Sequence, residues 1–487
     1  MLKKSKVSKY SLLILVVFLL FTFTFGIIHI NAAAMKGTKG TMRDISSLEL
    51  TKEMKVGWNL GNTLDAFGGE TNWGNPKTTK AMIDEIKSKG FNTLRIPITW
   101  KEHVSSAPDY TIDEEWMDRV QEVVDYGIDN NMYVIINTHH ESEWLIPTYD
   151  KETQVKEKLT KIWAQIAERF KNYSDYLVFE IMNEPRVEGS DNEWTGGTSE
   201  CREVINHLNL AAVNIIRDNG GNNALRHIMI PSHAASTTSS AVNDIVIPNN
   251  DSRIIVSLHM YSPYYFSMVI DETAVWGSDS DKSSLKSEFE TIYNKFIKNG
   301  RAVVLGEFGS INKDNLSARI THASFYAKSA REIGIPVIWW DNGIPGDGTE
   351  KESYAIFNRN ELTWYFPEIA NALIKNSSTP EQNCSVLYKI QNDWFNGASV
   401  NLTIKNNTSS EINEWELKWN FPGTQKINSL WNGSYEQNGS EVTVKNLDWN
   451  QTIAPSSSVS IGFNLFYDVT NNVPSYFTLN GIQCSVD

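Results

Sequence analysis

Two glutamates in this chain each stand at the end of a run of apolar residues. Glu184 closes the run that starts at residue 177, and Glu307 lies within the run 302–309. Burying an ionisable side chain is costly unless it has a partner or a chemical task. Two carboxylates in different environments can divide one reaction between them, because one donates a proton while the other, ionised, attacks. That is the equipment for cleaving a glycosidic bond.

Other polar and aromatic residues occupy equivalent positions, at the ends of further apolar runs. They are Arg95, His139, His140, Asn183, His259, Tyr261 and Trp340. So many such residues on one rim are hard to explain as ordinary strand-end charges. Arg95 and Tyr261 are expected to keep one glutamate ionised, and the other, desolvated near a like charge, is expected to have a raised pKa. The residues alone leave open which glutamate has which role.

The apolar runs are spaced like the strands of a β/α barrel. Eight of them are strand candidates: 56–61, 93–98, 133–140, 177–184, 227–232, 254–261, 302–309 and 336–342. Continuous apolar runs are typical of parallel strands buried on both faces, and helical patterns lie between them, for example at 77–89, 113–130 and 155–170. We therefore expect a (β/α)8 TIM barrel, whose strand ends meet at one rim. The alternative, a doubly wound sheet, usually has fewer strands and a Gly-rich phosphate turn that this chain lacks.

The pattern changes after residue 375. Apolar and polar residues alternate in the segments 400–405, 415–421 and 459–465, and Asn-Gly pairs at 432–433 and 438–439 mark turns. Period-two segments joined by such turns predict an all-β antiparallel sandwich. We place the barrel domain at 35–375 and the sandwich at 384–487. The linker between them, 376–383, has turn residues and no apolar periodicity.

The N-terminus carries the features of an export signal. Four lysines precede an apolar run, 12–28, that is followed by three alanines at 32–34. This order predicts a signal peptide at 1–34 and a secreted, extracellular protein, with an uncleaved membrane anchor as the alternative because the run is long. Export favours a disulfide between Cys384 and Cys484, which leaves Cys201 free and buried. The net charge of −14 argues against a nucleic-acid partner.

Three segments of the barrel portion resemble glycoside hydrolase family 5, in the wider group of Asn-Glu-Pro barrel enzymes. They read GWNLGNT at 57–63, VFEIMNEP at 178–185 and LGEFG at 305–309. Arg95, His139, the His-Met-Tyr triplet at 259–261 and the Trp pair at 339–340 occur in the family's order. The resemblance runs from residue 42 to residue 374.

The resemblance implies a role for each residue at the rim. Glu184 would be the acid/base and Glu307 the nucleophile of a retaining reaction, with Asn183 bound to the 2-hydroxyl of the sugar. Arg95 and Tyr261 would orient Glu307, His139 and His259 would line the site, and Trp340 would form a sugar platform. His140 either contacts the site or is a satisfied histidine behind it. Trp339 points away from Trp340 on its strand, so we expect it in the core.

The sandwich resembles carbohydrate-binding module family 2, through its bracketing cysteines and the pairs Trp431-Asn432 and Trp449-Asn450. Trp415 and Trp419 share a strand face with apolar residues, so they are expected in the core. The tryptophans at 394, 431 and 449 lie at strand ends outside those faces. A flat platform that stacks on a glucan chain would explain them, and core packing is the alternative.

These observations together predict a secreted endo-β-1,4-glucanase, a cellulase that retains anomeric configuration, acts on cellulose and related β-glucans as a monomer and needs no metal or other cofactor. A xylanase, xyloglucanase, lichenase or mannanase would use the same machinery. A non-catalytic polysaccharide-binding protein would have lost one carboxylate, and both are present. A metal-dependent hydrolase would need clustered ligands at several strand ends, and His139, His140 and His259 offer only a weak version of that.

Overall fold

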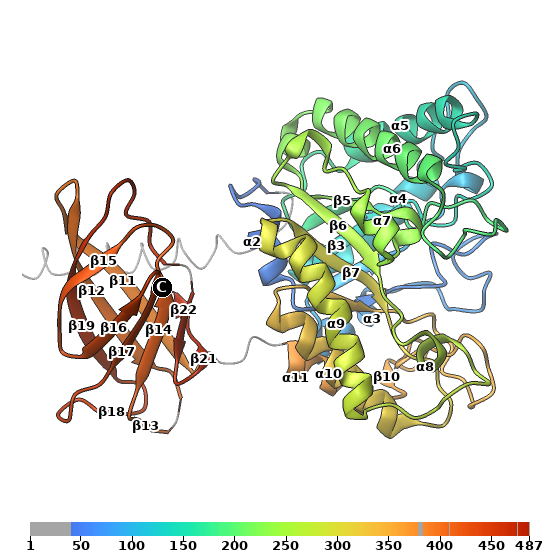
Figure 1. Ribbon diagram of the computed structural model, residues 1–487. Coiled ribbons are helices and arrows are strands. Elements are labelled where there is room, and N and C mark those ends of the chain that lie inside the picture. Colours follow the sequence, from blue (N-terminus) through green and yellow to red (C-terminus); the bar gives the residue numbers. More distant parts are fainter. Residues whose placement is uncertain (1–39, 378–382, 409, 475, 487) are drawn as a thin grey trace, which may run out of the picture. The chain divides into compact units, whose positions relative to one another are not determined.

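The protein forms two compact units that divide near residue 378 (Figure 1). The computed structural model describes residues 40–377, 383–408, 410–474 and 476–486. The expected signal peptide and most of the expected linker lie outside these residues. Within the described residues no helix has the length and apolar character needed to cross a membrane.

The first unit is a closed barrel of eight strands in sequential order, all parallel, so the predicted fold class is confirmed. The strands are β1 Val56–Asn59, β2 Thr93–Ile96, β3 Tyr133–Asn137, β4 Leu177–Glu180, β5 Ile228–Pro231, β6 Ile254–His259, β7 Ala302–Phe308 and β8 Val337–Trp339. Every residue in these strands is buried, as continuous apolar runs predict. Register pairs Gly57 with Thr93 on one side and with Ile338 on the other, which closes the barrel.

Helices and short additional strands surround the barrel. The helices are α2 Ser47–Glu53, α3 Lys80–Lys89, α4 Glu114–Asp129, α5 Glu152–Arg169, α6 Ser199–Asp218, α7 Ser239–Asn243, α8 Tyr264–Met268, α9 Asp279–Lys295, α10 Leu316–Glu332 and α11 Pro367–Ser377, and the short strands are β9 Phe357–Asn358 and β10 Thr363–Trp364. Side-chain caps fix several helix starts: Asp113 accepts from the amides of Glu115 and Trp116 at α4. Leu50 and Met54, in and just after α2, pack into the cluster of strand side chains that includes Ile135 and Val178.

Several strands end earlier than the sequence suggested. We expected the fourth strand to run to Glu184, but β4 ends at Glu180. The chain leaves the regular ladder there and keeps only single backbone bonds to its neighbours, such as Asn183 N–H to the carbonyl of Thr138 at 2.9 Å. Glu184 therefore stands on an extension beyond the strand.

The second unit is a β-sandwich. One sheet has the order β15-β19-β12-β11-β22 and the other β16-β17-β14-β20-β21. The strands are β11 Cys384–Asp393, β12 Gly397–Asn406, β13 Ile412–Asn413, β14 Glu416–Asn420, β15 Lys426–Trp431, β16 Ser434–Asn438, β17 Glu441–Lys445, β18 Thr452–Ile453, β19 Ser458–Phe466, β20 Phe477–Leu479, β21 Ile482–Gln483 and β22 Ser485–Val486. Pairing is antiparallel except between β11 and β22, which run parallel.

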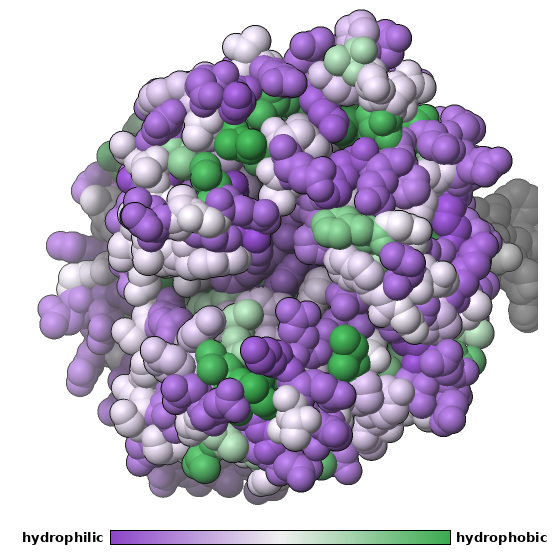
Figure 2. All heavy atoms as spheres, turned by 90° about the vertical axis from the view of Figure 1, so that its right-hand side faces the viewer, coloured by the Kyte–Doolittle hydropathy of each residue, from purple (hydrophilic) through white to green (hydrophobic). Residues whose placement is uncertain are grey.

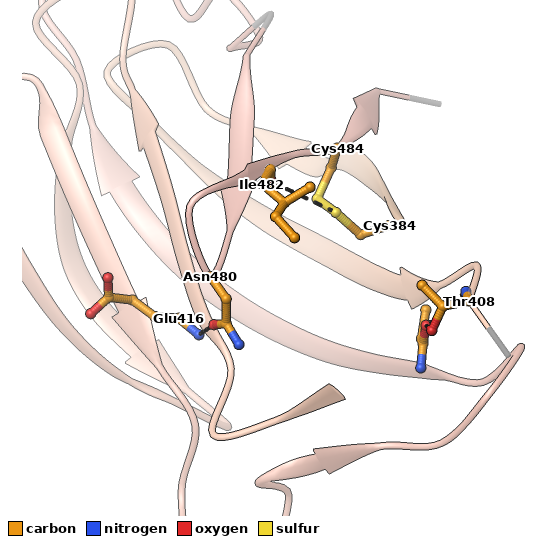
Figure 3. The surroundings of a disulfide bond; sticks show 7 residues. Cys384, Thr408, Glu416, Asn480, Ile482 and Cys484 are labelled. Atoms are coloured by element: carbon orange, nitrogen blue, oxygen red, sulfur yellow. Dashed lines mark hydrogen bonds between the residues drawn. A yellow bond between two sulfur atoms is a disulfide. The ribbon is translucent and has the colours of Figure 1, made fainter. Parts of the chain in front are cut away.

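The core of the sandwich contains the two tryptophans that the alternation predicted, because Trp415 and Trp419 are fully buried. The expected disulfide joins Cys384 to Cys484, with their Cα atoms 4.8 Å apart (Figure 3). The bond joins β11, the first strand of the sandwich, to the segment between β21 and β22. Cys201 is free and buried, as expected.

Candidate active site

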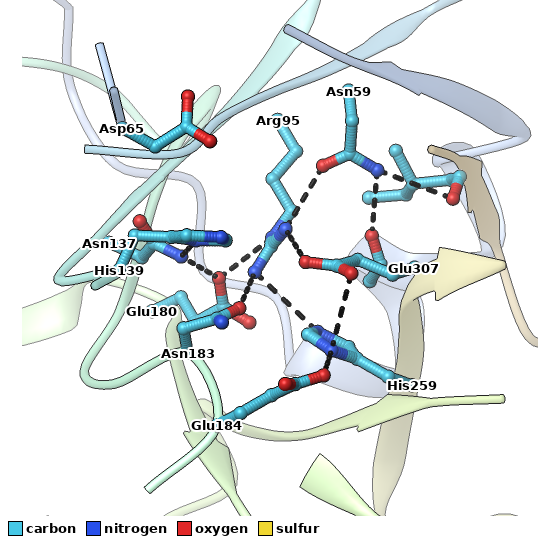
Figure 4. A network of polar contacts seen from close by, with 12 residues as sticks. Asn59, Asp65, Arg95, Asn137, His139, Glu180, Asn183, Glu184, His259 and Glu307 are labelled. Atoms are coloured by element: carbon cyan, nitrogen blue, oxygen red, sulfur yellow. Dashed lines mark hydrogen bonds and ion pairs between the residues drawn. The ribbon is translucent and has the colours of Figure 1, made fainter. Parts of the chain in front are cut away.

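Glu307 lies near the end of β7 and is almost fully buried. Its Oε1 accepts a hydrogen bond from Arg95 Nη1 at 2.7 Å (Figure 4). Its Oε2 accepts one from the Tyr261 hydroxyl at 2.9 Å. Both oxygens are thus held by donors from two other strands or strand extensions. A carboxylate held at both oxygens by donors, one of them a guanidinium, is kept in one orientation.

Glu184 faces Glu307 with His259 between them. His259 Nδ1 lies 2.7 Å from Glu184 Oε1 and 3.7 Å from Glu307 Oε2. One oxygen of each glutamate and a ring nitrogen of His259 all lie within 4.8 Å of one another. The carboxylates are therefore close enough for direct attack by one of them, since about 5–5.5 Å is typical of retaining glycosidases and about 6.5–9.5 Å of inverting ones.

The pKa of Glu184 differs from the sequence expectation. Burial raises the pKa of this carboxyl, but the hydrogen bond and charge of His259, together with Arg186 and Arg95, outweigh burial and leave the pKa below its ordinary value. Burial alone would lower the pKa of His259. The charge of Glu307 and the bond to Glu184 have the larger, opposite effect, so the pKa of His259 is raised. The prediction of a raised pKa for one glutamate was wrong for Glu184, because His259 lies between the two carboxylates and bonds to Glu184.

Arg95 is the centre of the polar network beneath both glutamates (Figure 4). Besides Glu307 it contacts Glu180 through Nε at 2.8 Å, Asn59 Oδ1 through Nη1 at 3.0 Å and Asn183 Oδ1 through Nη2 at 2.8 Å. The guanidinium is fully buried. Asn183 is thus held with its oxygen toward Arg95, so its amide nitrogen is the group available to a ligand.

Among the direct partners of Arg95, Glu180 and Asn59 are the two that the sequence did not single out. Glu180 is completely buried on β4, and it also accepts from Asn137 Nδ2 at 3.0 Å and from the Ser257 hydroxyl at 2.5 Å. A glutamate within a four-residue apolar strand was a visible signal, because such a charge needs a buried partner. Asn59 gave no comparable signal.

His139 and Trp340 form one wall of the site. Their rings are parallel, with centroids 5.9 Å apart. Asn137 Nδ2 donates to His139 Nδ1 at 3.1 Å while Asn137 Oδ1 accepts from the amide of Ile98, so the proton of neutral His139 resides on Nε2. Burial and the charge of neighbouring His140 hold the pKa of His139 well below its ordinary value. The ring therefore presents an N–H donor.

His140 lies beside His139, among aromatic rings, and also lines the cleft. It packs against Phe67 and Trp73, with centroids 5.5 and 5.6 Å away, and burial lowers its pKa to about 4. Together with His139 and Asp65 it forms a group whose ligand atoms lie within 4.8 Å of one another, the arrangement a metal ion would need. The Nε2 proton of His139 opposes that use, because a metal ligand must offer a lone pair.

The three sandwich tryptophans lie at the surface. Trp394, Trp431 and Trp449 have exposed fractions of 48%, 46% and 69%. Two glycines make room for their rings: a Cβ atom at Gly462 would lie 2.3 Å from Trp431 Cε2, and one at Gly397 would lie 2.6 Å from Trp394 Nε1. Both rings thus lie close against the strands β19 and β12, with apolar surface left open to solvent.

Figure 2 shows the face of the barrel unit on the right-hand side of Figure 1. A recess crosses it, lined mainly by hydrophilic residues, with separate hydrophobic side chains along the rim. A solvent-open cleft of about 320 Å³ is lined by His140, Asn183, Glu184, Arg186 and Glu188, among others. A (β/α)8 barrel with two close carboxylates at its rim and an aromatic wall defines the class of retaining glycoside hydrolases.

Comparison with known proteins agrees with this class. Residues 59–346 match the model of the family "Cellulase (glycosyl hydrolase family 5)", and residues 384–484 match that of the "Cellulose binding domain". The chain belongs to glycosyl hydrolase family 5 and carries a cellulose-binding domain after its catalytic barrel.

Named relatives are similar along most of the chain. Endoglucanase B of Clostridium cellulovorans is 57% identical over 372 residues, 76% of this chain and 83% of that protein. Endoglucanase A of Clostridium longisporum is 41% identical over 493 residues, 90% of this chain and 94% of that one. Among solved structures, a "GH5-4 broad specificity endoglucanase" from Clostridium acetobutylicum is 56% identical, with a TM-score of 0.67, and the match covers 68% of this chain and all of that one.

Proposed function

We propose that this endo-β-1,4-glucanase cleaves internal β-1,4-glucosidic bonds by double displacement, with Glu307 as nucleophile and Glu184 as acid/base. The observation that carries the assignment is the different setting of the two carboxylates. Glu307 is clamped at both oxygens by Arg95 and Tyr261. Glu184 has one polar partner on its carboxylate within 3 Å, His259, and it lines the solvent-open cleft.

In the first step Glu307 attacks the anomeric carbon of the bound glucosyl unit. The glycosidic bond breaks, Glu184 gives a proton to the departing oxygen, and a glycosyl ester of Glu307 forms. The proton comes from the Glu184–His259 pair, which holds it across 2.7 Å. Asn183 would donate its amide N–H to the 2-hydroxyl, where a bond that strengthens in the transition state lowers the barrier.

In the second step ionised Glu184 takes a proton from water, which attacks the same carbon and releases Glu307. Two inversions leave the product with the β configuration it began with. His139 would donate to the sugar through Nε2, and Trp340, whose ring is partly exposed, would stack on a sugar face. His140 packs edge-on against the His139 ring and lines the cleft beside it.

The mechanism is tested by proton NMR of products released from cellopentaose and by the variant Glu307→Gln. We expect the β anomer to appear first and Glu307→Gln to lose turnover while still binding the substrate, because an amide cannot form the ester. An initial α anomer, or near-normal activity of the variant, would sink the assignment.

The substrate range and setting of the enzyme are inferred in the same way. The broad specificity endoglucanase of Clostridium acetobutylicum is 56% identical over the 68% of this chain that it matches, and this supports activity on several β-1,4-glucans alongside cellulose. Side-by-side product analysis on carboxymethylcellulose, xyloglucan, lichenan, xylan and mannan tests it, and exclusive activity on xylan or mannan would refute it.

We further assign residues 1–34 to a signal peptide, 35–375 to the catalytic domain, 376–383 to a linker and 384–487 to the binding module of a secreted monomer.

The sandwich is assigned as a cellulose-binding module that acts through Trp394, Trp431 and Trp449. Their flat exposed rings would raise the local concentration of enzyme at a polymer surface. Removing residues 376–487 is expected to spare hydrolysis of soluble substrates and to reduce binding to insoluble cellulose. Replacing the three tryptophans with alanine should reduce binding to insoluble cellulose as much as the deletion does, and circular dichroism should show a folded sandwich. If the sandwich instead loses its melting transition, the three tryptophans are core residues.

A further inference from the structure

Arg186 follows the acid/base by two residues and is tied to it. Its Nη1 donates to the backbone carbonyl of Glu184 at 3.0 Å and lies 3.7 Å from Glu184 Oε2. Two carboxylates of the same loop fix the other side of the guanidinium: Glu193 contacts Nε at 2.9 Å, and Glu188 contacts Nη2 at 3.4 Å. Four contacts on one planar group hold it in a single orientation beside Glu184.

The same guanidinium covers one face of an aromatic ring. Its central carbon lies 4.5 Å from the centroid of Trp194, and Trp194 is 58% exposed. A large apolar side chain held rigidly against a cation, with most of its surface in solvent, is a ready stacking platform for a sugar ring. Nothing in the proposed mechanism uses this ring.

The position of the loop indicates which sugar would bind there. Glu184 protonates the oxygen that the departing sugar carries away, so groups anchored to its loop lie toward that sugar. The cleft over Glu184 is lined by Arg186 and Glu188 as well, on the same loop. Trp340 and His139, by contrast, follow other strands, β8 and β3, and stack on each other.

We propose that Arg186 is a positioning residue that fixes the acid/base carboxyl of Glu184 and links it to Trp194, which binds the leaving β-glucosyl unit. The inference rests on the proposed role of Glu184. Under this proposal one guanidinium, that of Arg186, supports both the binding of the leaving sugar and the delivery of a proton to that sugar.

The charge of Arg186 gives the proposal a signature in the pH profile. The ionisable groups that face Glu184 are His259, Arg186 and Arg95, with Glu307 beyond His259 and Glu188 beyond Arg186. A neighbouring cation favours the ionised carboxylate, so removing Arg186 raises the pKa of Glu184. Because the acid must be protonated for the first step, the alkaline limb of kcat/KM should then move upward, by about one pH unit for a cation this close.

The experiment compares two substrates on the full chain. In cellopentaose the leaving group is a sugar, and its departure needs a proton from the general acid. In β-cellobiosyl fluoride the leaving group is fluoride, which is small and departs readily without that proton. For R186Q we expect kcat/KM on cellopentaose to fall about tenfold or more, within the range that general acid catalysis contributes. The alkaline limb of its pH profile should also move upward, as described above. On the fluoride it should stay within about threefold, because that first step makes little use of the acid.

Variants of the platform and matched controls complete the test. W194A should raise KM for cellopentaose about tenfold, the most that one aromatic stack contributes, and leave the fluoride unchanged, with W194F recovering most of the loss. R186K keeps a cation and should keep the alkaline limb near wild type. R186M, which also removes the charge, replaces R186Q if that variant does not fold. R217Q is the control, because Arg217, near the end of α6, is buried to a similar degree and pairs with Asp251, which precedes β6.

Equal losses on both substrates with an unmoved alkaline limb would reduce Arg186 to a structural role and overturn the proposal. If W194A affects both substrates equally, Trp194 is not a platform for the leaving sugar. Glu184→Ala separates this failure from that of the proposed function. If this variant hydrolyses cellopentaose normally, the assignment of Glu184 itself falls. If it loses cellopentaose but keeps the fluoride, the assignment stands and only Arg186 and Trp194 are in question.

Discussion

Glu180→Gln removes one buried charge and leaves the hydrogen-bonding pattern in place. Glu180 Oε2 accepts from Arg95 Nε and Asn137 Nδ2, and a glutamine oxygen can continue to accept both. Oε1 accepts from the Ser257 hydroxyl, which can rotate and accept from a glutamine N–H instead. The substitution therefore isolates the contribution of the charge.

The expected magnitude follows from what remains around Arg95. Breaking a buried ion pair by removing one partner costs about 3–5 kcal/mol. Arg95 keeps Glu307 at 2.7 Å, so we expect the lower end, about 3 kcal/mol. Glu180→Ala also leaves the donors of Arg95 and Asn137 unsatisfied, which adds about 1–3 kcal/mol for each buried group.

Differential scanning calorimetry of the full chain measures this. The barrel transition of Glu180→Gln should fall by roughly 6 °C, taking about 2 °C for each kcal/mol in a large domain. The sandwich is a separate compact unit, so its transition serves as an internal reference, and exposed Glu361→Gln is the control. A barrel transition within about 1 °C of wild type, equivalent to less than 1 kcal/mol, would refute the view that Arg95 needs both carboxylates.

Three further changes have defined outcomes. Gly462→Ala should weaken binding to insoluble cellulose without changing soluble activity, because its Cβ would meet the Trp431 ring at 2.3 Å; a pull-down that matches wild type would contradict this. Replacing Cys384 and Cys484 by serine should destabilise the sandwich by up to about 4.7 kcal/mol, the chain-entropy value for a loop of about 100 residues, and an unmoved calorimetric transition would show that the bridge contributes nothing. Burial raises the pKa of Glu141 from 4.5 to about 7, so the folded barrel binds this proton more tightly than the unfolded chain and loses stability as pH rises across that window. Glu141→Gln should flatten that decline in calorimetry from pH 4.5 to 8, and an unchanged slope would exclude Glu141 as its source.

The barrel was predictable because each strand is buried on both faces and reads as a continuous apolar run. The same logic located the rim residues, since an ionisable residue that ends such a run is conspicuous. Arg95, Asn183, Glu184, His259, Tyr261 and Glu307 indeed come together in one network. Trp339, Trp415 and Trp419 are buried as their strand phases predicted.

Features that depend on distances between separate strands were not predictable. A charged residue in a short apolar strand is visible in the sequence, but the partners of Glu180, which are Arg95, Asn137 and Ser257 from three other strands, are not. The pKa of Glu184 depends on His259 lying between two carboxylates, and no spacing along the chain reveals that. The early end of β4 depends on where its neighbours stop pairing.

The most direct test of the central claim is to trap the covalent intermediate on Glu307. A 2-deoxy-2-fluoro-β-cellobioside with a dinitrophenyl leaving group allows the first displacement and slows the second, so the glycosyl ester should accumulate. Intact-mass measurement followed by peptide mapping should find one fluorocellobiosyl unit, attached to the peptide that contains Glu307. Attachment to Glu184 or Glu180, or turnover of substrate with the α anomer released and no adduct formed, would contradict the mechanism.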